Sequence, residues 1–522
     1  MQKLSGLDAM FLYLETQKTP MHIAGLSVCQ PPEGYDGDAY EDFKAQIASR
    51  LHEIPAFHRI LRPTPFEIDH PVWINADEVD MDYHIQRAHL PKPGRLEQLR
   101  LLIQRLHSQV LDRSRPLWQF HIIEGLEDED FNLKPGTFAL YTKSHHACVD
   151  GGAGISVMDI ISDREPTPRP PLPKSQIRLS SQEPGFFEML GSAYGRMLQQ
   201  QVDLVAALPK ISSAFSNVVR SFGGENSWSL KDLAPAPKTR FNTRIEQQRA
   251  YGAQTLSLPE VIAVAKAAGA TINDVVLSIC GGALRLYLAR HNELPEKSLI
   301  AGVPVSLREL GDTSTNNQVA GILCAIGTDI DDPVERLKAV QAAAKRGKAQ
   351  IGSVREVIPQ DYNIFGAPAV LTIMSQLADR TSLIERMPAF LNVAISNVPG
   401  PRRPMYFAGS KVVGYFPVSI AAHGCALNIT LHSYVDRLDF GLMACKKTVP
   451  DVQDIADDIV GEFRRLQAAV EGATAAKGAA TTKKKAASPN GKTKAPRKAP
   501  AKRKPRTTKT TRGNGQTTQP GG

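Results

Sequence analysis

The sequence predicts a mixed α/β fold built from two sections and followed by a basic tail. On either side of a proline-rich segment, the chain combines apolar residues at helical spacing with short strand-like runs. Its 522 residues, 42% hydrophobic and 22% charged, suffice for large cores and more than one domain. We therefore predict a first section over residues 1–165, a connection over 166–240, a second section over 241–470 and a tail over 471–522.

In the first section, helix and strand signals alternate. The segment RLEQLRLLIQRLHSQVLD predicts a helix, because its apolar residues recur at helical spacing: Leu96, Leu99, Ile103, Leu106 and Val110. The runs LWQFHIIEG and GTFALYTKSHH predict two strands. The connection opens with REPTPRPPLPKSQ, whose proline density is typical of a linker, and continues with an amphipathic segment over residues 186–222.

The second section carries its own helix, strands and hairpin. In GATINDVVLSICGGALRLYLARHN, a helical stripe is formed by Ile272, Val276, Ile279, Ala283 and Leu286. Thr271 and Asp274 have the spacing of a capping box at its start. LIAGVPVSLR and LNVAISNVPGP predict strands that lead into turns, and CALNITLHSYVDRLDFGLMACK predicts a hairpin around Asp436.

The net charge of +9 divides sharply along the chain. From Gly472 onward there are 14 Lys and Arg and no Asp or Glu, so the rest carries 48 basic and 53 acidic residues, a net −5. The tail is rich in Lys, Ala, Pro and Thr and lacks aromatic residues, so we expect it to be disordered. The acidic body gives no reason to expect nucleic-acid binding.

Cysteine spacing and apolar runs exclude several other classes. The six cysteines are scattered without a CxxC pair, which argues against a disulfide framework and a cysteine-based zinc site. The sequence contains no run of about 18 apolar residues, so it predicts no membrane-spanning helix. Asp8 and Glu15 interrupt the apolar pattern near the N-terminus, so we expect a cytosolic start rather than a signal peptide.

The stretch LYTKSHHACVDGGAG places two adjacent histidines ahead of an Asp-Gly pair. On a strand, neighbouring side chains point to opposite faces, so only one of His145 and His146 can face a given cavity. The residues alone leave four interpretations open: packed histidines beside a turn that Asp150 caps, a metal site, a Cys148 nucleophile, or His146 as a general base with Asp150 as its partner.

A resemblance separates these interpretations. HHACVDG resembles the His-His-x-x-x-Asp-Gly motif of the CoA-dependent acyltransferase superfamily. Over residues 3–468 the chain is similar to one branch, the bacterial wax ester synthase/diacylglycerol acyltransferases. It shares their opening LSGLDAMFLYLET, the Pro-Leu-Trp and Asn-Asp motifs, and PVSLR, NNQVAG and ISNVPGP, all in the family's order.

The resemblance implies a fold and a set of site residues. Relatives have two domains like chloramphenicol acetyltransferase, with the active-site channel between them. It implies His146 as the general base, His145 as its support, and Asp150 as a structural residue paired with Arg308. Cys148 falls at a variable position of the motif. Residues expected near the substrates are Gly151, Pro116, Leu117, Trp118, Asn273, Asp274, Ser396 and Asn397. Without the family, Trp118 would be read as core and Asn273 and Asp274 as helix-start residues.

The implied reaction moves a long-chain acyl group from acyl-CoA to diacylglycerol or a fatty alcohol, giving triacylglycerol or wax ester. Acyl-CoA is a substrate, and no metal or other cofactor is expected. Alternatives are another hydroxyl acceptor and a non-catalytic lipid-droplet protein of the same fold. Acyl length and oligomeric state stay open.

Because such products are insoluble, we expect a cytoplasmic protein peripherally attached to the inner face of the membrane or to lipid inclusions. Residues 186–222 and the basic tail are candidate contacts with lipid. The tail alternatively suits nucleic acid.

Overall fold

The computed structural model describes residues 2–65, 69–128, 133–148, 157–174, 236–306, 319–354 and 367–486, with a few more between 185 and 195. Residues 1–473 form one compact unit and residues 474–522 a second. Most of the predicted amphipathic segment over residues 186–222 lies outside the described residues, as do residues 487–522 of the tail.

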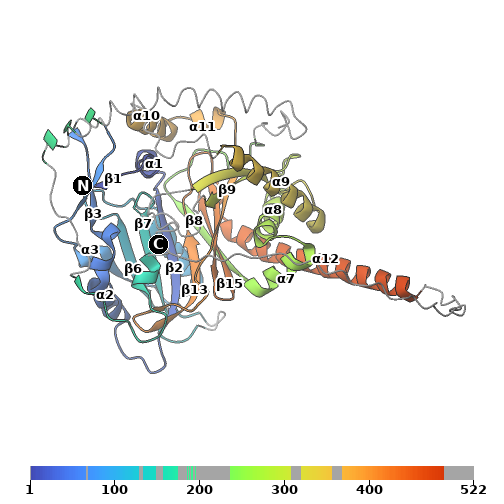
Figure 1. Ribbon diagram of the computed structural model, residues 1–522, viewed down its shortest axis with the longest axis horizontal. Helices are drawn as coiled ribbons and strands as arrows, with labels where there is room; N and C mark the ends of the chain where they lie inside the picture. The colour runs from blue at the N-terminus through green and yellow to red at the C-terminus, as the bar shows by residue number, and fades with distance from the viewer. Residues whose placement is uncertain are drawn as a thin grey trace, which may run out of the picture. The chain divides into compact units, whose positions relative to one another are not determined.

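Two six-stranded sheets organise the compact unit, as Figure 1 shows. The first has the order β12–β13–β2–β7–β6–β5, and its strands are β2 (His22–Gln30), β5 (Ile85–His89), β6 (Trp118–Glu124), β7 (Phe138–His145), β12 (Tyr406–Phe407) and β13 (Ser410–Val418). Strand β7 lies between β2 and β6 and pairs antiparallel with both. The two strands predicted in the first section are therefore confirmed as β6 and β7.

The second sheet has the order β10–β9–β11–β14–β15–β8. Its strands are β8 (Arg249–Ser257), β9 (Ile300–Ser306), β10 (Val319–Ala325), β11 (Val393–Val398), β14 (Leu427–Tyr434) and β15 (Arg437–Cys445). β14 and β15 form the predicted hairpin, with Tyr434 opposite Arg437. β11 runs parallel to β14 and β9, so the strands predicted in the second section are also confirmed.

One strand pair crosses from the second half of the chain into the first sheet. β13 pairs antiparallel with β2, with Tyr415 opposite Ser27, and β12 pairs with the outer edge of β13. The chain then returns to the second sheet through β14. The two halves of the sequence are thus interlocked, and the predicted domain boundaries at residues 165 and 241 stay predictions.

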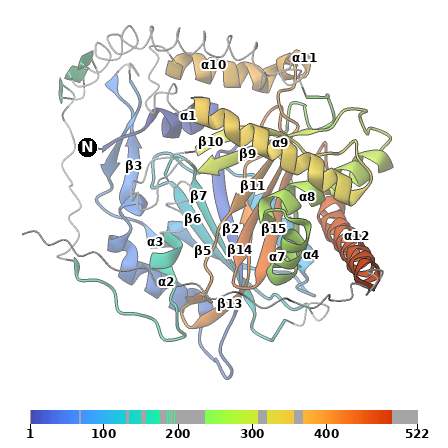
Figure 2. The same ribbon diagram turned by 45° about the vertical axis from the view of Figure 1, so that its right-hand side comes forward.

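Four helices cover one face of the second sheet (Figure 2): α7 (Leu258–Ala268), α8 (Ile272–Arg290), α9 (Pro333–Val354) and α12 (Val452–Ala486). Their apolar residues share a core with Ile429, Leu431 and Phe440 of the sheet. The predicted capping box is confirmed, because Thr271 Oγ1 accepts from the N–H of Asp274 at 3.2 Å and Asp274 Oδ2 accepts from that of Thr271 at 2.9 Å.

Helix α8 is, in the described part of the chain, the one helix long and apolar enough to cross a membrane. Of its most apolar window, 72% is buried inside the protein. The apolar residues of α8 therefore form part of the core of the second sheet.

Different helices cover the two faces of the first sheet. On one face, Phe43 and Ile47 of α2 (Ala39–Arg50) pack with Phe120. On the other, Leu99 and Ile103 of α4 (Leu96–His107), the helix predicted from its spacing, pack in a core that also holds Tyr141, with Tyr251 and Met443 of the second sheet.

The remaining elements are small and lie mostly in the first half of the chain. They are β1 (Gln2–Lys3), α1 (Gly6–Leu14), η1 (Leu51–Glu53), η2 (Pro55–His58), β3 (Arg59–Arg62), β4 (Val72–Asn75), α3 (Met81–His84), α10 (Ala367–Arg380) and α11 (Leu383–Arg386). Strands β1, β4 and β3 form a separate three-stranded sheet.

The expected disorder of the tail is wrong for its first residues. Helix α12 continues to Ala486, so residues 471–486 are helical. Their sequence, EGATAAKGAATTKKKA, is rich in the strong helix formers Ala and Lys. Extending an existing helix avoids the cost of nucleating a new one, so these residues can continue α12 without contributing to a core.

Candidate active site

The two motif histidines stand at the end of the central strand of the first sheet. The N–H of His145 donates to the carbonyl of Leu117 at 2.9 Å, and that of His146 donates to the carbonyl of Met21, also at 2.9 Å. Hydrogen bonds therefore alternate between the two neighbouring segments up to His146. This strand-like alternation places the two imidazoles on opposite faces, as predicted.

Helix α1 contacts both histidines: its Phe11 contacts His146, and Glu15 at its C-cap faces His145. Its buried Ala9 and Leu12 share a small core with Leu117 and Ala147, which fixes the helix over the end of β7. Phe11 of α1 stacks on the ring of His146, with centroids 4.0 Å apart and planes 10° from parallel.

His146 is half-buried, and its Nδ1 atom is buried without a hydrogen-bond partner among the residues that the structure describes. Burial lowers its pKa to about 4, with a further lowering from His145 that a backbone hydrogen bond opposes. The imidazole is therefore neutral near pH 7, and one of its two nitrogens is free to accept a proton.

His145 is fully buried, and its two ring nitrogens have different neighbours. Its Nδ1 accepts from the N–H of Ala147 at 3.0 Å, which leaves the ring proton of the neutral form on Nε2. That atom lies 3.4 Å from Glu15 Oε1, long for a hydrogen bond, so the contact is mainly electrostatic.

Glu15, at the C-cap of α1, is the main site residue that the sequence did not predict. Its carboxylate also accepts from the N–H of Met21 at 3.0 Å and from Arg113 Nη2 at 3.0 Å. Burial acts to raise its pKa, but His145, Arg113 and the Met21 N–H together lower it to about 2. The signal for it in the sequence is its position in the LSGLDAMFLYLET motif.

Lys143 adds a second buried charged group on the His145 side of β7. Its Nζ donates to the carbonyls of Leu106 at 3.0 Å and Gln109 at 3.2 Å, both at the end of α4. Burial lowers its pKa to about 8, against the opposing effect of Glu15. The strand face behind His146 is therefore polar, and the Lys143 bonds join the end of β7 to the C-terminal end of α4.

The cysteine-nucleophile interpretation has no support from the environment of Cys148. Burial raises the pKa of its thiol to about 12, so the thiol is protonated near neutral pH and lacks nucleophilic thiolate. All six cysteines are free. Within the described ranges, no group of three or more His, Cys, Asp or Glu side chains could hold a metal ion.

Asp150, Gly151 and Arg308 all lie outside the described residues. The structural pair of Asp150 with Arg308 therefore stays a prediction, and so does the contribution of Gly151 to substrate binding.

The Pro-Leu-Trp segment lies at the start of β6, next to the end of β7 that carries the histidines. Trp118 is 1% exposed, donates its indole N–H to the carbonyl of Phe57 at 3.0 Å and stacks between Phe57 and His84. Leu117 is buried and holds His145 through its carbonyl. The contacts of these two side chains are with protein, and a role of Pro116, Leu117 and Trp118 in the channel stays a prediction.

The predicted site residues of the second section lie in the elements that their motifs indicated. Asp274 is buried and occupied by the capping box, while Asn273 is half-buried in the first turn of α8. Ser396 and Asn397 are half-buried in β11, beside Thr430 and Leu431 of β14. In the described part of the chain, no hydrogen bond or ring contact joins these four residues to His146.

A contact path not predicted from the sequence joins the two sheets on the His146 face of β7. Thr142 Oγ1 lies 3.3 Å from both the nitrogen and the oxygen of Gly25. A Cβ at Gly25 would lie 2.8 Å from the ring of Tyr415, so glycine allows this residue of the crossing strand to approach. Tyr415 in turn stacks on His432 of β14 at 4.9 Å.

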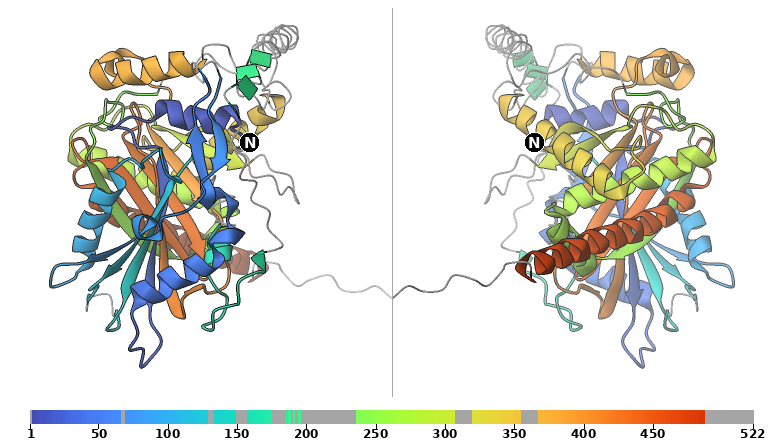
Figure 3. Two further views of the ribbon diagram at one scale, coloured as in Figure 1. Left: turned by 90° about the vertical axis from the view of Figure 1, so that its left-hand side faces the viewer. Right: turned by 90° about the vertical axis from the view of Figure 1, so that its right-hand side faces the viewer.

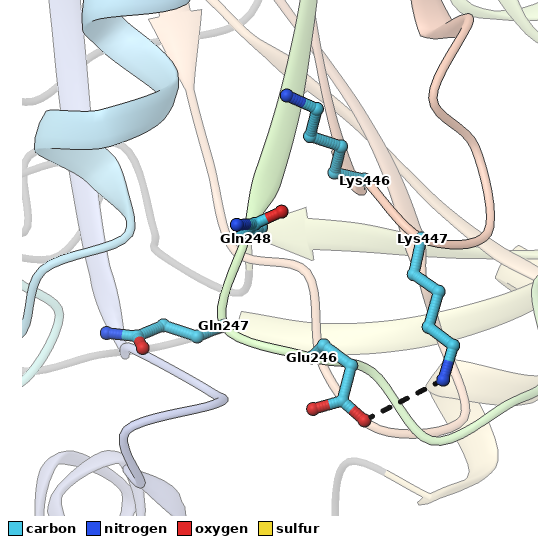
Figure 4. A pocket seen from close by; sticks show the side chains of 5 residues that line it. All are labelled: Glu246, Gln247, Gln248, Lys446 and Lys447. Carbon is cyan, nitrogen blue, oxygen red and sulfur yellow. Dashed lines mark ion pairs between the residues drawn. The ribbon is translucent and has the colours of Figure 1, made fainter.

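A surface depression of about 520 Å³ lies outside this site (Figure 4). It is lined by Glu246, Gln247, Gln248, Lys446 and Lys447, with Lys447 Nζ 4.0 Å from Glu246 Oε1. None of these residues belongs to the histidine motif. We therefore place the candidate chemistry at His146 and not in this depression.

The fold has a distant match among solved structures. The structure aligns with the first condensation domain of the calcium-dependent antibiotic synthetase with a TM-score of 0.50 at 12% identity, covering 90% of this chain and 96% of that one. At this identity the likeness shows the fold alone.

Closer relatives define the family. Residues 4–276 match the wax ester synthase/diacylglycerol acyltransferase catalytic domain, and residues 315–467 match the C-terminal domain of the same family. A wax ester synthase/diacylglycerol acyltransferase from Marinobacter aquaeolei has a solved structure that aligns with a TM-score of 0.63 at 30% identity, covering 90% of this chain and 99% of that one.

Sequence relatives agree. A Mycobacterium tuberculosis protein named as a diacylglycerol O-acyltransferase is 37% identical over 472 residues, 90% of this chain and 100% of its own length. The O-acyltransferase WSD of Acinetobacter baylyi is 33% identical over 479 residues, 90% of this chain and 98% of its own. The chain belongs to the wax ester synthase/diacylglycerol acyltransferase family, and it is an O-acyltransferase, as the sequence predicted.

Proposed function

We propose that this enzyme transfers a long-chain acyl group from acyl-CoA to the hydroxyl of diacylglycerol or a fatty alcohol, with His146 as the general base. The observation that carries the assignment is the neutral, half-buried imidazole at the end of β7 with a nitrogen free to accept a proton. The product is triacylglycerol or wax ester, and acyl-CoA takes part as a substrate, with no further cofactor.

In the proposed reaction, His146 removes the acceptor's hydroxyl proton as the oxygen attacks the thioester carbonyl. The tetrahedral intermediate then collapses, the carbon–sulfur bond breaks, and the imidazolium returns the proton to the departing CoA thiolate. Base assistance of this kind contributes about 10²–10⁴-fold in rate. His145, bonded to Ala147 and facing Glu15, keeps the end of β7 in place and does not itself exchange the proton.

The environment of His146 supports direct attack by the acceptor rather than an acyl-enzyme. A cysteine route would need a thiolate at Cys148, and burial keeps that thiol protonated. Phe11 against the imidazole supports an apolar approach to the base, which suits a lipid acceptor.

One assay tests the proposal. Purified protein with a long-chain acyl-CoA is offered a fatty alcohol and a diacylglycerol in parallel, and free CoA and ester are quantified. We expect equal amounts of CoA and ester with at least one acceptor. CoA release without ester would indicate a hydrolase, and no turnover with any hydroxyl acceptor would favour a non-catalytic lipid-droplet protein.

The same proposal includes attachment to lipid. An enzyme with insoluble products has to work at a lipid surface, so we propose peripheral association with the inner face of the membrane or with lipid inclusions.

A further inference from the structure

Helix α10 and the segment after it expose a group of large apolar side chains. Ile373, Met374 and Leu377 of α10 are 55%, 44% and 42% exposed, while Met387 and Phe390 are 40% and 65% exposed. We call these five residues the α10–α11 face. Exposed apolar groups concentrated in one short stretch of a folded chain mark interaction sites more often than scattered ones do.

The other side of α10 rests on α1. Ser375 and Ala378 are buried, and Ser375 Oγ donates to the carbonyl of Tyr13 at 3.0 Å. Figures 1 and 3 show α10 along the outer side of the compact unit with α1 directly beneath it. Because Phe11 of α1 stacks on His146, α10 itself and α1 are the two helices between the α10–α11 face and the proposed base.

Basic side chains surround the C-terminal end of α10. Lys18 and Arg244 both donate to the carbonyl of Asp379, at 3.4 and 3.2 Å, and Lys238 donates to that of Glu385 at 2.7 Å. Arg380 and Arg386 are exposed on the two helices themselves.

The acidic groups nearby are fewer and already have partners. Asp379 accepts from His423 at 2.7 Å, Glu385 from Thr243 at 3.3 Å, and Glu246 pairs with Lys18 at 3.0 Å. Among the residues that the structure describes, five cations therefore stand against three carboxylates around the apolar face, and two of the five, Lys18 and Arg244, share Glu246.

We propose that the α10–α11 face docks on an anionic lipid surface and brings α1 and the His146 site to it. This inference rests on the proposed function, because a lipid acceptor has to leave such a surface to reach the base. An apolar helix face with a basic rim matches the interface of a bilayer that holds anionic headgroups. The five side chains would enter the lipid, and the exposed cations Lys238, Arg380 and Arg386 would contact headgroup phosphates.

The test compares full-length variants on vesicles of phosphatidylcholine with about one third phosphatidylglycerol. Ile373→Ser/Leu377→Ser removes two residues of the face. Ile262→Ser/Leu101→Ser is the matched control, because these residues on α7 and α4 have the same types and are 46% and 45% exposed. Flotation is measured at low and at high salt, since salt screens the contribution of the basic tail.

We expect the Ile373/Leu377 variant to partition onto vesicles about tenfold less than wild type at high salt, because two apolar side chains no longer enter the lipid. The control should partition as wild type does. In a separate measurement, a tryptophan introduced by Phe390→Trp should shift its emission to the blue when vesicles are added.

Equal partitioning of wild type, variant and control would overturn the inference, as would an unshifted tryptophan emission. A wild-type dimer that becomes monomeric in the Ile373/Leu377 variant would also overturn it, by making the face a contact between copies. Ester formation from dispersed short-chain substrates should be the same in all three proteins. If that activity is absent from wild type, the proposed function fails independently of the lipid contact.

Discussion

At the scale of single residues, the two adjacent motif histidines differ in their hydrogen-bond and ring contacts. His145 is bonded at Nδ1 and faces a carboxylate, whereas His146 lies against an aromatic ring with a buried, unpartnered Nδ1 in the described structure. The same residue type is thereby used for support at one position and is available for proton transfer at the next.

The lowered pKa of His146 predicts the pH dependence of the enzyme. A general base is active when unprotonated, so kcat/KM should stay level from pH 7 downward and fall only as the pH drops through about 4. An ordinary histidine would give a midpoint near 6.5. The measurement is a pH profile with a soluble acyl-CoA and a short alcohol, with circular dichroism confirming that the protein is folded at each pH. A midpoint near 6.5 would show that the base is not buried as described.

Glu15 predicts a separate effect on stability. Its pKa is lowered from 4.5 to about 2 in the folded protein, so the stabilisation is complete above the unfolded pKa and is lost as the pH falls toward 2. A shift of this size corresponds to roughly 3 kcal/mol. Wild type should have a higher free energy of unfolding than Glu15→Gln at pH 7, and much of this difference should be lost at pH 3. Urea unfolding at both pH values measures it. A difference between the two proteins that does not change with pH would contradict this role.

At the scale of elements, the sequence predicted what depends on local pattern. Alternation placed the two histidines on opposite faces of β7, the Thr271 and Asp274 spacing gave the start of α8, and Asp436 marked the hairpin. Each of these features is determined by residues a few positions apart.

Features that depend on distant residues were not predictable in the same way. The pairing of β13 with β2 and the approach of Glu15 to His145 join segments far apart in the chain, and no local spacing encodes either contact. Family resemblance implies a general-base role for His146, but it does not give the contacts of Phe11 and Glu15 with the two histidines.

The crossing strand predicts a specific packing constraint at Gly25. Gly25→Val should destabilise the protein by about 1–3 kcal/mol, because even a Cβ atom would lie 2.8 Å from the Tyr415 ring. Thermal melts of the single variants and of Gly25→Val/Tyr415→Ala form a double-mutant cycle. We expect the pair to be less destabilised than the sum of the singles. Strict additivity would indicate that the two positions do not meet.

At the scale of the whole molecule, the interlocked sheets place strand β7 beside residues from both halves of the sequence. Tyr415 belongs to the second half by sequence and to the first sheet by pairing, and it contacts His432 of the second sheet. Relative motion of the two sheets would therefore disturb the surroundings of β7 directly.

The basic tail should be dispensable for chemistry. Residues 1–473 form a compact unit, and Val470 is the last residue in the core of the second sheet. A protein ending after residue 473 should retain its melting temperature and its activity on dispersed substrate, and bind less to anionic vesicles at low salt. Loss of activity on dispersed substrate would make the tail part of the catalytic body, while unchanged vesicle binding would leave it without a lipid role.

The assignment of His146 as the general base is tested most directly by the turnover of His146→Ala, with Cys148→Ala as the neighbouring control. Ester and free CoA are quantified from acyl-CoA and a hydroxyl acceptor, and melting temperatures verify the fold of each protein. We predict a fall in kcat of about 10²–10⁴-fold for His146→Ala and near wild-type turnover for Cys148→Ala. A folded His146→Ala protein with wild-type turnover, or a folded but inactive Cys148→Ala protein whose parent traps an acyl-cysteine, would contradict the mechanism.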